Sequence, residues 1–296
     1  MLNLFNRHKQ LLDEEIIEWI FACFSWTLKE FDQDVFFNET QLVIPDNKHF
    51  PGKETTANGM ANLIFEQVKN YAGMAHWPTR LFDLTVQPAI DNSQTVFING
   101  DLRGKNAQVK ASPNAAQPNP LLNGTQQAMP LSSMPMSSFP QPQISQNSYI
   151  AFGYHPQQLK SPEGIIAYFA HGLSHHLAGT AKTQPPGGES YLPMAGEITG
   201  IFMGFGIMFA NSAIIARAGG CGGCGGGQSP VREVILSEQE ATYALALFCH
   251  LKSIEYRQVA RHLKKHLRGF FKDALKDCQR RSPESSSLQL EKSVTD

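Results

Sequence analysis

Apolar side chains in the first hundred residues recur first at helical and then at strand-like intervals. Residues 11–31 and 56–71 repeat apolar positions every three or four residues, which predicts two amphipathic helices. Three short runs, 41–45, 81–86 and 95–99, are rich in residues that favour strands. The N-terminal part of the chain therefore has the pattern of a small α+β unit.

A polar stretch interrupts this pattern. Residues 105–147 consist mainly of Pro, Gln, Asn, Ser and Met, and such a segment buries too little apolar surface to offset its chain entropy. Strand character resumes at residues 148–154. We therefore expect four parts: an N-terminal α+β region (1–104), a disordered insertion (105–147), a mainly helical region (148–280) and a flexible tail (281–296).

Four helices are predicted in the second half of the chain, at residues 162–178, 193–217, 237–251 and 256–277. The first begins at Ser161-Pro162, where serine is an N-cap and proline suits the first helical position. The small residues around Gly204 are expected to allow close packing against the helix at 162–178. The expected fold class is α+β, with a small sheet packed on a helix of the second half.

Residues 198–216 carry no charged side chain and approach the length of a membrane span. Glycines, Asn211 and Ser212 within the stretch, and Glu197 at its edge, favour a helix buried in the protein core. A membrane-associated protein anchored by residues 198–216 remains the alternative.

Charge and cysteine content narrow the functional classes. A net charge of −1 gives no general attraction to nucleic acid or anionic lipid. The N-terminal residues lack the apolar core of a secretory signal, and five cysteines do not form a disulfide framework. We expect a cytoplasmic protein that binds no nucleic acid.

Two histidines mark the candidate chemistry of the chain. His171 and His175 are four residues apart on a predicted helix, so both imidazoles project from one face. A zinc site needs a third protein ligand, and Glu197 at the start of the next apolar helix could supply it. The alternative is a pair of packed, hydrogen-bonded histidines with no metal.

The segment AHGLSHHL (170–177) resembles the AHELxHxL form of the HExxH helix of zincin metallopeptidases. Glu197 is similar to the third ligand of the gluzincin branch. The segments FPGK (50–53), YAGMAHWP (71–78) and YALALF (243–248) are similar to those of an uncharacterised bacterial zincin-like group.

This resemblance implies a zincin-like fold and a Zn²⁺ ion held by His171, His175 and Glu197. It also implies impaired catalysis, because the position of the family's general base is Gly172. Gly200 stands where an aspartate often supports a metal-bound histidine. The expected function is a metallopeptidase-like protein with weakened or lost hydrolysis. The alternative is a non-catalytic protein that binds zinc, or a peptide or protein ligand.

Two further motifs are weaker. Cys221 and Cys224 have the C-x-x-C spacing of half a zinc knuckle, within a glycine run that is typical of a linker. His262 and His266 lie on a basic helix face, for which no carboxylate partner is evident. We expect this face to be solvated.

Overall fold

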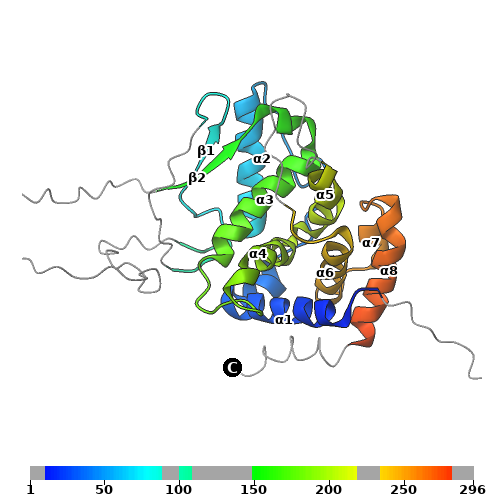
Figure 1. The fold of residues 1–296 in the computed structure, drawn as a ribbon. Helices are drawn as coiled ribbons and strands as arrows, with labels where there is room; N and C mark the ends of the chain where they lie inside the picture. Colours follow the sequence, from blue (N-terminus) through cyan, green and yellow to red (C-terminus); the bar gives the residue numbers. More distant parts are fainter. Residues whose placement is uncertain (1–10, 89–99, 109–148, 219–233, 282–296) are drawn as a thin grey trace, which may run out of the picture.

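The computed structural model describes residues 11–88, 100–108, 149–218 and 234–281. Helices dominate this part of the chain, and two strands form a small sheet (Figure 1). The elements are, in chain order, α1 (Glu14–Glu30), η1 (Val35–Glu39), α2 (Ala57–Ala72), β1 (Thr79–Asp83), β2 (Ile150–Tyr154), η3 (Pro156–Lys160), α3 (Pro162–Ala178), η4 (Glu189–Tyr191), α4 (Leu192–Gly200), η5 (Ile201–Phe205), α5 (Gly206–Ala218), α6 (Glu238–Leu251), α7 (Tyr256–Ala260) and α8 (Lys265–Arg280).

The sheet is parallel, and its register places Thr79 opposite Ile150 and Asp83 opposite Tyr154. The α+β class and the strand expected at 148–154 are confirmed. The strand expected at 81–86 ends at Asp83, because the Asp83 carboxylate accepts a hydrogen bond from the Thr85 backbone at 2.8 Å and closes a turn.

Residues 41–45 do not form the predicted strand. This segment runs extended without a strand partner among the described residues, and its Val43 N–H donates to the carbonyl oxygen of Gly204 at 2.9 Å. The strand expected at 95–99, the C-x-x-C pair at 221–224 and most of the polar insertion lie outside the described residues.

One hydrophobic core includes side chains from α1 through α8. Helix α3 packs against α2, α4 and α5, while α6 packs against α5 and α8 (Figure 1). The rings of Phe36 and Phe202 stack at 4.6 Å, and both side chains are fully buried. Helix α3, which carries the two histidines, is therefore held by helices from both halves of the chain.

The helix expected at 193–217 is broken into α4, η5 and α5. Gly204 causes the break: its φ is +100°, and a Cβ atom there would lie 2.1 Å from the carbonyl oxygen of Gln41. The close approach at Gly204 is therefore to the extended segment at 41–43. Elements η5 and α5, which contain the small residues around Gly204, also contact α3.

The helix expected at 256–277 is also broken, into α7 and α8. Asn211 of α5 reaches into this break, where its side-chain oxygen accepts a hydrogen bond from Lys264 N at 3.0 Å. Its amide nitrogen donates to the His262 carbonyl oxygen at 2.9 Å. The Asn211 side chain thus forms hydrogen bonds with backbone groups that lie between the two helices.

The stretch Glu189–Ala213 is apolar and long enough to cross a membrane by length and composition, but 83% of its most apolar window is buried inside the protein. Such burial is typical of a helix in a protein core.

Helix α1 is fastened to the connection between α3 and α4. The indole nitrogens of Trp19 and Trp26 donate to the carbonyl oxygens of Pro186 and Thr183, at 2.9 and 3.1 Å. The Glu30 carboxylate accepts from the Lys182 backbone at 2.6 Å. Helix α1 therefore restrains the segment that joins the two halves of the candidate site.

Candidate metal centre

Helix α3 presents His171 and His175 on one face, as their spacing predicts. Their ring centroids lie 4.1 Å apart, with the ring planes tilted by 46°. The helix begins at Pro162, and Ser161 occupies the N-cap position without a side-chain capping hydrogen bond. The packing of α3 on α2, α4 and α5, rather than the cap, positions this face.

Glu197 of α4 lies beside the histidine pair and is 1% exposed. Its Oε1 atom is 3.7 Å from Nδ1 of His171, and its Oε2 atom accepts a hydrogen bond from the Leu236 backbone at 2.8 Å. Leu236 immediately precedes Ser237, the N-cap of α6. The carboxylate therefore links α3, α4 and the start of α6.

Gly196 makes room for His175. A Cβ atom at position 196 would lie 2.8 Å from Nε2 of His175, which is closer than a real side chain tolerates. The imidazole edge that carries Nε2 therefore rests on the backbone of α4. Sequence reasoning missed Gly196; the available signal was a glycine inside a helix, a position that ordinarily costs stability.

The donor set suits zinc, which binds histidine nitrogen and carboxylate oxygen. Two ligand atoms about 2.1 Å from a tetrahedral zinc ion are about 3.4 Å apart, and the His171–Glu197 separation of 3.7 Å is close to this value. In the arrangement observed, no group of three or more His, Cys, Asp or Glu side chains in the described ranges could hold a metal ion. Coordination by all three residues would therefore require these side chains to rearrange.

The resemblance places a general base at position 172, but a side chain of the sheet occupies the space that such a base would need. A Cβ atom on Gly172 would lie 2.8 Å from Cε1 of Phe152, a buried residue of β2. A replacement base would have to be another acid such as Glu163 or Glu189. Glu163 lies nine residues before Gly172 on α3, about 13.5 Å along the helix axis. Its carboxylate accepts from Asn211 at 3.2 Å instead. Glu189 is exposed in η4.

Gly200 also lies against an aromatic ring, that of Phe209. A Cβ atom there would lie 2.4 Å from Cζ of Phe209 on α5, so the position expected to hold an aspartate is a tight core contact. His176 packs edge-on against Phe152 at 5.3 Å, and desolvation lowers its pKa. It therefore points away from the other two histidines.

Two other features of the chain also bear on metal binding. His266 Nε2 lies 3.1 Å from Oε2 of Glu238, so the expectation that the basic face has no carboxylate partner is wrong. Cys249 is buried in α6, and burial raises the pKa of its thiol. A raised pKa disfavours the thiolate that metal binding requires.

Fold and site together define an α+β protein in which two partly buried histidines of α3 lie beside a buried carboxylate of α4. Comparisons with known protein families, with curated proteins and with solved structures found no match for this chain.

Proposed function

We propose that this chain is a zincin-like, gluzincin-type protein that binds one Zn²⁺ ion and has lost most or all hydrolytic activity. The observation that supports it best is the approach of Glu197, 1% exposed, to within 3.7 Å of His171. Burial of a carboxylate is costly unless its charge is compensated, and a metal ion bound by the same histidine would compensate it.

In this proposal His171, His175 and Glu197 hold the ion. Bound zinc would act as a Lewis acid that polarises a carbonyl group or a water molecule. Helix α1 and the start of α6 keep the three ligands near one another through the Trp19, Trp26 and Leu236 hydrogen bonds.

Loss of hydrolysis follows from the Phe152 ring that occupies the space beside Gly172. A positioned general base typically contributes about 10²- to 10⁴-fold to the rate, and position 172 offers no proton acceptor. Binding of a peptide or protein ligand does not require that base. We therefore propose that the protein retains ligand binding although it has lost hydrolysis.

The first test is metal analysis of the purified chain. We expect about one zinc per chain, as three protein ligands with one open position would hold, and its loss in His171→Ala and in Glu197→Gln. His176→Ala is the matched control, because His176 lies on the same helix but faces Phe152. Gly196→Ala keeps every ligand but displaces the His175 ring, and should weaken zinc binding about tenfold or more.

The proposal fails if the purified wild-type chain carries no zinc and added zinc raises its melting temperature no more than that of His171→Ala/His175→Ala. The cluster would then be a structural contact between α3, α4 and α6.

The second test measures cleavage of unstructured peptides by the zinc-loaded chain. We expect little or no activity from the natural sequence. Gly172→Glu/Phe152→Ala restores both the acid and its space, and should gain activity that Gly172→Gln/Phe152→Ala lacks. Robust zinc-dependent cleavage by the natural chain, unimproved in the double variant, would show that another residue is the base.

A further inference from the structure

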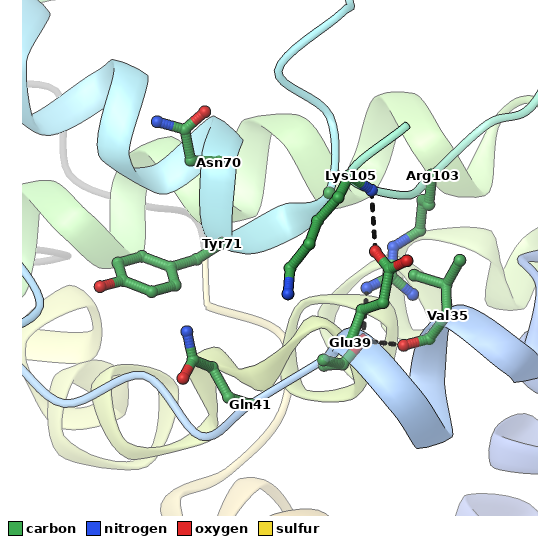
Figure 2. A pocket seen from close by; sticks show the side chains of 9 residues that line it. Val35, Glu39, Gln41, Asn70, Tyr71, Arg103 and Lys105 are labelled. Atoms are coloured by element: carbon green, nitrogen blue, oxygen red, sulfur yellow. Dashed lines mark hydrogen bonds between the residues drawn. The ribbon is translucent and has the colours of Figure 1, made fainter. Parts of the chain in front are cut away.

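A small, partly open cavity lies where η1, the C-terminal end of α2 and residues 100–108 meet (Figure 2). Its volume is about 40 Å³. Polar and charged side chains dominate the lining, among them Glu39, Gln41, Asn70, Tyr71, Arg103 and Lys105.

Arg103 is the most deeply buried of these residues, at 1% exposed. Its Nε donates to the Ala72 carbonyl oxygen and its Nη2 donates to Oγ1 of Thr40, both at 2.9 Å. The guanidinium carbon lies 5.1 Å from the ring centroid of Phe202. Nη1 is buried and has no hydrogen-bond partner among the described residues.

A buried guanidinium with an unused donor is energetically costly unless something satisfies it. Burial lowers the pKa of Arg103 to about 10, so the side chain still carries its charge at neutral pH. Asp32 and Glu39 act on this charge only through space, since neither forms an ion pair with Arg103 in the part of the chain that the structure describes.

Lys105 adds a second positive charge to the cavity. Its backbone N–H donates to Oε2 of Glu39 at 2.8 Å, which anchors the main chain and leaves the side chain free to extend. Figure 2 shows that side chain reaching into the space between Tyr71 and Glu39. Its ammonium group makes no hydrogen bond or ion pair with the described residues. Two cations therefore face a single lining carboxylate.

Neutral side chains complete the lining, namely those of Gln41, Asn70 and Tyr71. In Figure 2 the Tyr71 hydroxyl and the Asn70 amide point away from Arg103 and Lys105. Burial, followed by the charge of Asp46, raises the pKa of Tyr71, so its phenol keeps its proton. The cavity thus has two cationic side chains and one carboxylate, a net positive charge that favours an anion.

Size narrows the class of ligand. A water molecule needs about 10–15 Å³ of such volume, so the cavity holds about three waters. Three oxygen positions match one carboxylate or phosphate group, whereas an aromatic ring or a nucleotide base is too large. The opening to solvent lets the remainder of a larger molecule lie outside.

We propose that this cavity binds the oxyanion of a small ligand, a phosphate or a carboxylate group, with Arg103 and Lys105 as its charged donors. The proposal is independent of the metal centre.

The test titrates inorganic phosphate and sodium acetate into the full chain at constant ionic strength, with chloride as the reference salt. Binding is followed by melting temperature and calorimetry. At least one oxyanion should raise the melting temperature of the wild-type chain above the chloride reference. Preference for phosphate would identify a phosphoryl group, and preference for acetate a carboxylate.

Three variants distinguish specific oxyanion binding at the cavity from a general effect of the protein's positive charges. Lys105→Gln should weaken binding about tenfold, the equivalent of one charge-assisted hydrogen bond. Lys160→Gln removes the same charge from the exposed end of η3 and should leave binding unchanged. Glu39→Gln keeps an acceptor for the Lys105 backbone but removes the competing charge, and should strengthen binding.

Arg103→Met should abolish binding, with circular dichroism as the check on folding. If this variant does not fold, the Lys105 and Glu39 variants test whether the cavity binds the oxyanion. The proposal is wrong if neither oxyanion exceeds chloride, or if Lys105→Gln and Lys160→Gln behave alike.

Discussion

Three glycines around the candidate metal centre each lie where a ring from another residue comes too close for a side chain. Phe152 approaches Gly172, His175 approaches Gly196, and Phe209 approaches Gly200. Two of these positions attracted notice in the sequence as missing acids. The structure adds a packing reason for them, because no Cβ atom fits there unless the neighbouring ring moves.

The contact at Gly172 predicts an unusual response to alanine. Gly172→Ala should lower the free energy of unfolding by up to about 2 kcal/mol, because overpacking costs about 1–3 kcal/mol and the helix-propensity gain offsets only about 1 kcal/mol of it. Gly269 of α8 has no atom within 4 Å of an added Cβ, so Gly269→Ala should be stabilising. Urea denaturation compares the two variants, and stabilisation of both would contradict the Phe152 contact.

Among the elements, the break at Gly204 has the strictest local requirement. Its φ of +100° disfavours any other residue, and the Gln41 carbonyl oxygen occupies the place of a Cβ atom. We expect Gly204→Ala to lower the free energy of unfolding by more than about 3 kcal/mol. Urea denaturation with Gly269→Ala as the control measures this, and a loss below about 1 kcal/mol would mean that the segment at 41–43 can retreat.

Helical periodicity was sufficient to predict α1, α2, α3 and α6 from the sequence. The capping prediction did less well: Ser161 makes no side-chain capping hydrogen bond, whereas Thr56 and Ser237 accept hydrogen bonds from the first turns of α2 and α6. The spacing of the two histidines likewise predicted their common face.

The breaks between α4 and α5 and between α7 and α8 were not predictable from periodicity. Each depends on a partner that is remote in sequence, namely the Gln41 carbonyl for the first break and Asn211 for the second. The same reason applies to Gly172, since only the folded chain brings Phe152 against it.

At the scale of the whole molecule, an ionic contact joins α1 to the end of α8. Arg281 donates to both carboxylate oxygens of Glu14, at 2.6 and 2.8 Å, and its Nε donates to Asp277 at 3.0 Å. Tyr243 of α6 donates to the same Asp277 carboxylate at 2.7 Å. The hydrogen bond from Arg281 lowers the pKa of Glu14 below its ordinary value of 4.5.

A lowered folded-state pKa gives a stability contribution that is present above the unfolded pKa and is lost as the pH falls through the folded value. Glu14 is 55% exposed, so this contribution is at most about 1 kcal/mol at neutral pH. Glu14→Gln should therefore be less stable than wild type at pH 7, and the difference should vanish below the folded pKa. Urea denaturation from pH 7 to pH 3 tests this. Glu15→Gln, an exposed neighbour, should show no such pH dependence.

The hydrogen bonds that join α1 to the segment between α3 and α4 can form only late in translation. Glu30 and its partner Lys182 are 152 residues apart. At about 5–20 residues per second, roughly 8–30 s of translation separate them. During that interval the apolar face of α1, with Ile20 and Phe24 at its centre, has no α3–α4 connection to dock against. The apolar face of α1 therefore stays without this partner on the nascent chain until the α3–α4 connection has been synthesised.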